Sequence, residues 1–178
     1  MKNNISNYYQ NIISYDLLTK NHFQNVFQLP KIHQISLNIG FKNANIEKNK
    51  LVNILVFLKL LSNQKPIETK SRKNNIFFKI KKNSIIGCKI TLKGKNAYSL
   101  IEQFILFILP QENYALIINK EKTNGVFDFQ IKNIFNFLAF KKELFQFKDI
   151  PPMDVSIEVN KTNSKEFFML LNALYLIK

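Results

Sequence analysis

Several stretches of the chain alternate apolar and polar residues at the spacing of a half-buried β-strand. They are residues 31–40 (KIHQISLNIG), 67–72 (IETKSR), 86–93 (IGCKITLK), 126–131 (VFDFQI) and 153–159 (MDVSIEV). Because successive side chains of a strand point to opposite faces, the alternation predicts one apolar and one polar face in each. In the first stretch His33 falls with Ile35, Leu37 and Ile39, so we expect a core-edge histidine rather than a metal ligand.

Apolar residues recur at helical spacing in four other stretches, residues 5–18, 46–61, 96–109 and 164–174. In the first, Ile5, Tyr8 or Tyr9, Ile12, Ile13 and Leu17 share one face. Asn45 can cap the second helix, Pro110 ends the third, and Asn163 with Glu166 fits a capping box for the last. The order α-β-α-β-β-α-β-β-α predicts an α+β fold, a largely antiparallel sheet of about five strands with helices packed against it. We expect one domain over residues 1–178.

Charge is concentrated in one part of this chain. The formal net charge is +14, and residues 65–95 hold ten basic residues and a single acid, Glu68. A basic cluster of this density favours a polyanionic partner. The alternative is a solvated hairpin whose lysines serve only solubility, and the one-sided clustering argues against it.

The basic cluster lies on two predicted strands and the loop between them. Glu68, Lys70 and Arg72 share one side of the first strand, and Lys89, Thr91 and Lys93 share one side of the second. The long loop carries Asn74 and Asn75 at its tip, followed by Phe77 and Phe78. A basic strand pair with a long basic loop suits contacts to the backbone of folded nucleic acid.

Composition narrows the setting in which the protein works. The chain has 25 Lys but a single Arg and about two dozen Asn, a usage typical of an extremely A+T-rich genome, as in organelles and reduced endosymbionts. Its one cysteine, Cys88, excludes an intramolecular disulfide and favours a reducing compartment. The N-terminus shows neither a secretory nor an organelle-targeting pattern, so we expect an organellar protein to be made inside the organelle. No apolar run is long enough to span a bilayer.

Motifs of catalysis are absent from the sequence. The four glycines form no phosphate-binding loop, and neither HExxH nor CxxC occurs. The aspartates are scattered, and Cys88 lies on the apolar face of a predicted strand, as a small buried hydrophobe does. We therefore expect no enzyme, no cofactor and no metal.

The motifs together resemble the universal large-subunit ribosomal protein five family, whose members bind 5S rRNA. The resemblance is carried by Tyr8-Tyr9, by LPKI and SLNIG at residues 29–32 and 36–40, and by QKPI with TKSRK at 64–67 and 69–73. It is closest in FKIK at 78–81 and IGCKITLKG at 86–94, and continues in Leu109-Pro110 and MDV at 153–155. It weakens after Pro110, so residues 111–150 are expected to be a divergent part of the same domain.

The resemblance implies a structural protein that docks on 5S rRNA and large-subunit rRNA in the central protuberance. It also implies that the loop approaches P-site tRNA and that another surface meets a small-subunit head protein. The matching RNA-contact positions are Asn38, Gln64 and Thr91, to which we add the neighbouring cations Lys65, Lys70, Arg72, Lys73, Lys89 and Lys93. The tRNA-facing loop positions are Asn74, Asn75, Phe77, Lys79, Lys81 and Lys82.

Together with the A+T bias, the resemblance predicts a mitochondrial ribosome, with a plastid or an endosymbiont cytoplasm as the other settings. A basic protein that binds RNA or DNA outside the ribosome is the alternative function. A peripheral membrane protein is a third class, and the expected partners include no membrane because the cations lie on strands and a loop rather than on an amphipathic helix.

Overall fold

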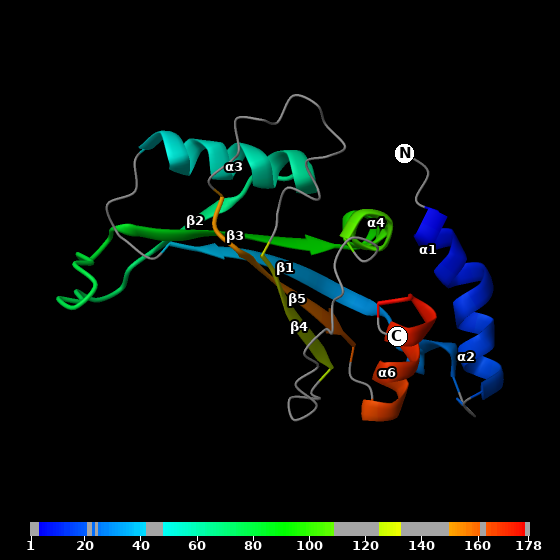
Figure 1. Cartoon of the computed structure of the whole chain (residues 1–178). Helices are drawn as coiled ribbons and strands as arrows, with labels where there is room; N and C mark the ends of the chain where they lie inside the picture. Colours follow the sequence, from blue (N-terminus) through cyan, green and yellow to red (C-terminus); the bar gives the residue numbers. More distant parts are fainter. Residues whose placement is uncertain are drawn as a thin grey trace. The chain divides into compact units, whose positions relative to one another are not determined.

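The computed structural model describes residues 4–20, 23, 25–41, 48–108, 125–132, 150–160 and 163–176. Its centre is a five-stranded antiparallel sheet with the strand order β2-β3-β1-β5-β4 (Figure 1). The strands are β1 (Ile32–Gly40), β2 (Ile67–Lys70), β3 (Ile85–Lys93), β4 (Val126–Ile131) and β5 (Met153–Val159). Helices complete an α+β fold, as the alternation of the sequence predicts.

The helices lie close to their predicted places. The first consists of α1 (Asn4–Tyr8), a π-helical turn (Tyr9–Ile13) and α2 (Ser14–Lys20). The others are α3 (Lys48–Ser62), α4 (Lys95–Gln103) with a following π-helical segment (Phe104–Ile108), and α6 (Ser164–Ala173). A short 3₁₀ turn, Val26–Gln28, precedes β1. The expected cap at Asn45, the stop at Pro110 and most of residues 111–150 lie outside the described residues.

The chain forms two compact units. Unit 1 comprises residues 1–35, 92–129 and 156–178, and unit 2 comprises residues 36–91 and 130–155. In unit 1, the Tyr9 hydroxyl donates a 2.7 Å hydrogen bond to the Pro30 carbonyl, and the Tyr9 ring lies 5.8 Å from that of Tyr98 in α4. These contacts join the first helix to α4 and to the segment that enters β1.

Helix α6 in unit 1 begins as predicted. The Glu166 carboxylate accepts a 3.3 Å hydrogen bond from the Asn163 backbone N–H, which is the reciprocal half of a capping box. Phe167, Leu170, Leu171 and Leu174 are buried on one face of the helix and its end. Their burial stabilises the last helix far more than its intrinsic propensity does.

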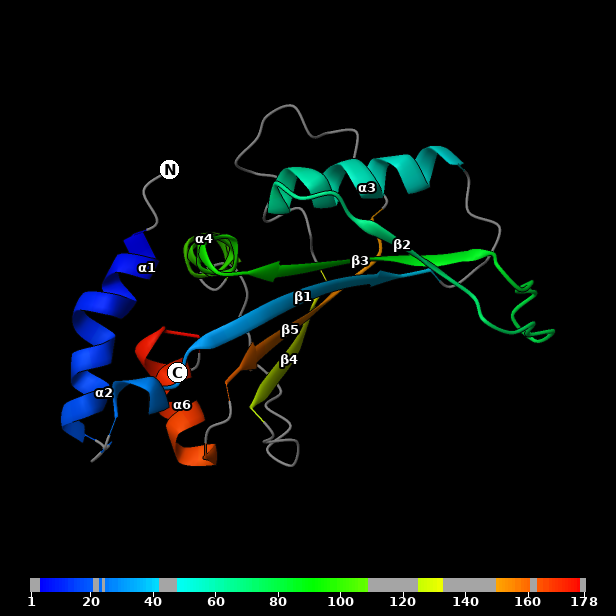
Figure 2. The ribbon, with the colours of Figure 1, turned by 180° about the vertical axis from the view of Figure 1, so that it is seen from behind.

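In unit 2, α3 runs along β2 and β3 (Figures 1 and 2). Its side chains Ile54, Phe57 and Leu58 are buried, as are Leu37 and Ile39 of β1 and Cys88 and Ile90 of β3. The buried Cys88 confirms its expected role as a small hydrophobe. Burial, and to a smaller extent the nearby Glu68 carboxylate, raises the pKa of its thiol to about 11.

Gly87 allows β1, β2 and β3 to approach one another closely. A Cβ atom at this position would lie 2.6 Å from the Ile39 carbonyl oxygen and 3.0 Å from Thr69 Oγ1. A backbone oxygen cannot yield as a flexible side chain can, so the close approach requires glycine. The position is part of the IGCKITLKG segment, and the structure shows its physical purpose.

Two expectations about buried faces are wrong. His33 is exposed, and its neighbour Ile32, which points to the opposite face of β1, is buried instead. Burying a polar ring costs free energy, whereas burying an aliphatic side chain is favourable. Ile12 is 53% exposed. The π-helical turn lengthens the repeat locally, so that Tyr9, Ile13 and Leu17, each four residues apart, form the buried face instead.

Candidate nucleic-acid interface

The polar face of β3 is built by strict alternation. Cys88 and Ile90 are buried, while Lys89 and Thr91 between them are exposed. The alternation continues to Leu92, which is buried, and Lys93, which is exposed. The prediction that Lys89, Thr91 and Lys93 share one face of this strand is confirmed.

Pairing with β1 brings Asn38 beside Lys89. The Phe41 N–H donates a 2.9 Å hydrogen bond to the Ile86 carbonyl, and Gly40 Cα lies 3.4 Å from a Cβ built on Gly87. Counting back along the antiparallel strands from these contacts places Asn38 opposite Lys89 and Ser36 opposite Thr91. Directly opposed residues point to the same face, so Asn38, Lys89 and Thr91 lie together. Asn38 is half-buried, and the other two are exposed.

The pairing of β2 corrects the predicted faces of that strand. Ile67 is opposite Lys89, and Glu68 is opposite Cys88. Ile67 therefore stands on the polar face, where it is 70% exposed, and Glu68 does not share the side of Lys89. A register shift between Thr69 and Lys70 then places Lys70 opposite Ile85, so that Ile86 is an extra residue of β3 with no partner in β2. The bulge therefore interrupts the alternation of β3, and Lys70 stays on the same side of β2 as Glu68, away from Lys89.

We call Asn38, Lys89 and Thr91 the basic face. Their side chains combine two neutral hydrogen-bonding groups with one cation on the adjacent strands β1 and β3. Amide and hydroxyl groups can bond to sugar hydroxyls and phosphates, and lysines neutralise phosphate charge. The basic face is thus chemically suited to the backbone of folded RNA.

Gln64 and Lys65 lie outside the basic face, in the connection from α3 to β2. The Gln64 backbone N–H donates to Ser62 Oγ at 3.2 Å, and its side chain is half-buried. Within the described part of the chain, Gln64 forms no hydrogen bond with Asn38 or Thr91. Lys65 is exposed.

The loop between β2 and β3, residues 71–84, is a hydrogen-bonded hairpin that extends beyond the strand ends (Figure 2). We call it the hairpin loop. At its base the Ser71 N–H donates to the Ser84 carbonyl, and the Asn83 N–H donates to the Ser71 carbonyl, both at 2.9 Å. The Lys82 N–H donates to Asn74 Oδ1 at 2.6 Å. The Asn74 side chain therefore braces the loop, a role that its position in the sequence does not reveal.

The tip of the hairpin loop is closed by a second pair of bonds. Asn75 and Ile80 exchange backbone hydrogen bonds of 2.8 and 2.9 Å, and the Phe78 N–H donates to Asn75 Oδ1 at 3.4 Å. The cations of the loop are exposed, and they are Arg72, Lys73, Lys79, Lys81 and Lys82. Among the described residues, none of these five forms an ion pair. Their charge remains available to a polyanion.

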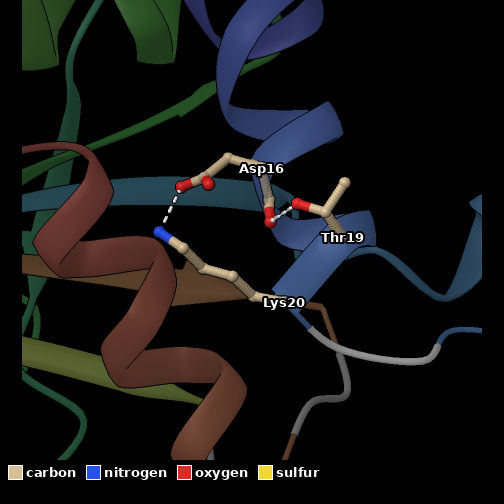
Figure 3. Close-up of polar contacts among 3 residues, drawn as sticks. All are labelled: Asp16, Thr19 and Lys20. Carbon is tan, nitrogen blue, oxygen red and sulfur yellow. Dashed lines mark hydrogen bonds and ion pairs between the residues drawn. The ribbon is translucent and has the colours of Figure 1, made fainter.

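Lys20, at the end of α2, forms an ion pair with a described residue, unlike the five cations of the hairpin loop. Lys20 Nζ lies 2.6 Å from Asp16 Oδ2, and Thr19 Oγ1 donates to the Asp16 carbonyl at 2.9 Å (Figure 3). An adjacent carboxylate compensates this cation locally. Lys20 therefore differs from the cations of unit 2 and offers a natural control for them.

The described residues offer little for catalysis, metal binding or membrane insertion. They contain no group of three or more His, Cys, Asp or Glu side chains that could hold a metal ion. No helix among them has the length and apolar character that a membrane crossing needs. The fold and the basic face together define a nucleic-acid-binding protein of the α+β class.

Comparison with known proteins identifies the family. The chain matches the family model described as "Ribosomal protein L5" over residues 25–81, and over residues 85–176 it matches the model that describes the C-terminus of the same ribosomal family. It is 34% identical to the large ribosomal subunit protein uL5 of Buchnera aphidicola, with 93% of each chain covered. It is 30% identical to the uL5 of Blochmanniella floridana, covering 95% of this chain and 89% of the relative. It is 29% identical to the uL5m of Reclinomonas americana, covering 96% and 94%.

The chain belongs to the ribosomal protein L5 family. It is accordingly a structural protein of the large ribosomal subunit that binds rRNA, and not an enzyme.

Proposed function

We propose that the chain binds 5S rRNA and large-subunit rRNA in the central protuberance, with the basic face as its principal contact. The observation that carries the proposal is the meeting of Asn38, Lys89 and Thr91 on one face of unit 2. Neutral groups that bond to RNA and a cation that neutralises phosphate stand there side by side. Gln64, Lys65, Arg72, Lys73 and Lys93 would add contacts at the borders of this surface.

The same proposal assigns the hairpin loop to P-site tRNA and a further surface to a small-subunit head protein. Support for the tRNA contact comes from the five loop cations that form no ion pair with a described residue, and from the extension of the loop beyond the ends of β2 and β3 (Figure 1). The family resemblance supports the contact to the head protein. We further propose that residues 1–178 act as one ribosomal-protein domain.

A salt series with the purified chain and 5S rRNA of the same organism tests the rRNA contact. Neutralising about five to eight phosphates should give log K against log salt a slope of about −4 to −7. Lys89→Ala should make the slope shallower by about 0.7 to 0.9. The control is Lys20→Ala, which removes a cation already compensated by Asp16 and should leave the slope unchanged. An affinity independent of salt, or equal effects of the two variants, would contradict the proposed contact.

We also propose that the ribosome is mitochondrial. The A+T-biased composition and the similarity to the uL5m of Reclinomonas americana support this setting. The similarity to proteins of the endosymbionts Buchnera and Blochmanniella makes an endosymbiont cytoplasm the second candidate. Locating the gene in the mitochondrial or the bacterial genome of the source cells distinguishes the two, and a gene in an endosymbiont chromosome would refute the mitochondrial proposal.

A further inference from the structure

The hairpin loop presents three apolar side chains directly to water. Ile76 is 90% exposed, Phe77 is 97% exposed, and Phe78 is also exposed. The Phe77 ring contacts no other aromatic ring among the described residues. We call Ile76, Phe77 and Phe78 the loop tip. A contiguous apolar group at the end of an otherwise polar loop costs solubility, so it points to a binding role.

The backbone beneath the loop tip is held in place. The paired bonds between Asn75 and Ile80 and the 3.1 Å bond from the Lys79 N–H to the Ile76 carbonyl close a turn of four residues. Lys79 takes a positive φ of 51° to complete this turn. Phe77 is therefore presented by a preorganised turn, which lowers the entropy that binding would cost.

The surroundings of the loop tip indicate which partner it fits. Lys79, Lys81 and Lys82 follow it, and Arg72 and Lys73 precede it. The sequence has no acidic residue between Glu68 and Glu102. An aromatic ring flanked by exposed cations suits a nucleobase with its phosphates, because the ring stacks on the base while the lysines neutralise the backbone.

We infer that Phe77 stacks on an unpaired nucleobase of ribosomal RNA or tRNA, and that the loop tip thereby reads an exposed base. The inference rests on the proposed function, since it requires the chain to meet RNA through unit 2. It adds a contact that depends on a π-face rather than on charge. Phe77 is then the residue that distinguishes an unstacked base from a regular RNA duplex.

Substitutions at residue 77 separate stacking from simple apolar contact. Phe77→Leu keeps an apolar side chain but removes the ring, and Phe77→Tyr keeps the ring. A matched control is Phe27→Leu, because Phe27 is 95% exposed in unit 1, outside the basic cluster. Since the Phe77 side chain is almost fully exposed, its variants should unfold at the same urea concentration as the unaltered chain.

Two binding measurements locate the base. In the first, the full chain is titrated with the 5S rRNA and large-subunit rRNA of the source organism. In the second, large subunits that carry each variant are titrated with tRNA from the same cells. Phe77→Leu should weaken one of these interactions by about 5- to 100-fold with an unchanged salt slope, while Phe77→Tyr and Phe27→Leu bind normally. Loss in the first assay assigns the base to rRNA, and loss in the second assigns it to tRNA.

Other outcomes overturn the inference. If Phe77→Leu binds both RNAs like the unaltered chain, no base stacks on this ring. If Phe77→Leu retains binding while Phe77→Asp abolishes joining to the subunit, the loop tip meets a protein or lipid surface instead. An equal loss in Phe27→Leu would show a general apolar effect. Lys89→Ala in the same assays distinguishes the proposed rRNA contact of the basic face from the stacking of Phe77. If Lys89→Ala reduces the salt slope while Phe77→Leu binds normally, the rRNA contact stands and only the stacking is refuted.

Discussion

At the scale of single residues, the basic face combines a positive charge with neutral hydrogen-bonding groups. Lys89 supplies a cation, whereas Asn38 and Thr91 beside it are neutral. The sequence pattern predicts that Lys89 and Thr91 are exposed. The pairing of β1 with β3 shows in addition that Asn38 lies beside them. A positive charge attracts the phosphates of any RNA, so discrimination between one RNA and another depends on Asn38 and Thr91.

Replacing Thr91 tests this division. Thr91→Val keeps the β-branched shape, so the strand should fold normally. If the hydroxyl bonds to RNA, its loss leaves an RNA group unpaired at a cost of about 1–3 kcal/mol, and affinity for the cognate RNA should fall about tenfold. The salt slope should stay the same because no phosphate loses its counter-charge. Normal affinity of Thr91→Val in a filter-binding titration would show that the hydroxyl makes no such contact.

The Cys88 thiol has a predictable pH dependence. Burial raises its pKa to about 11, so the folded protein holds this proton at pH values where the unfolded chain has released it. Stability should therefore fall as the pH rises from about 9 toward 11, because the unfolded state binds fewer protons there. Urea unfolding at pH 8 and pH 10 should show a smaller difference for Cys88→Ala than for the unaltered chain. Rapid reaction of the native thiol with Ellman's reagent at pH 8 would contradict its burial.

At the scale of elements, the sequence predicts the strands better than their pairing. Alternation identifies β1, β3, β4 and β5 and the buried faces of β1 and β3. It fails for β2, because the pairing with β3 leaves Ile67 exposed beside Lys89 and puts Glu68 on the other side, which the alternation of β2 alone does not reveal. The π-helical turn that exposes Ile12 and the hydrogen bonds of Asn74 and Asn75 within the hairpin loop likewise have no signature in the hydrophobic pattern. The cations of the candidate site could thus be predicted, but their arrangement could not.

The capping box of α6 makes a stability prediction. Asn163→Ala removes the side chain at the helix start, where it is exposed and touches the Glu166 carboxylate. The free energy of unfolding should fall by about 0.5–2 kcal/mol. Urea denaturation followed by circular dichroism measures this change. Asn160→Ala, an exposed asparagine just after β5, is the control and should change stability much less.

The amide hydrogens of the hairpin loop should exchange with solvent at rates that differ from residue to residue. In the free chain the Asn75 and Ile80 amides are bonded to each other's carbonyls and should be protected relative to that of Phe77. Binding to RNA in the ribosome should slow exchange across the whole loop. Hydrogen exchange read by mass spectrometry compares the free chain with the purified large subunit. Equal protection of residues 71–84 in both states would contradict a role of the loop in binding.

At the scale of the whole molecule, much of the positive charge lies on exposed side chains that a polyanionic partner can contact. Residues 65–95 hold ten of the 26 basic residues and a single acid, and the loop cations among them are exposed and unpaired within the described part of the chain. The high apolar content lets so basic a chain fold.

Cross-linking inside the ribosome tests the central claim most directly. Large subunits from the source cells are washed in high salt and irradiated, and the RNA joined to the chain is sequenced. The account predicts that the chain stays with the subunit and that peptides containing Asn38 or residues 89–91 are joined to 5S rRNA. Release of the chain as free protein, or cross-links from these peptides to RNA outside the large subunit, would contradict it.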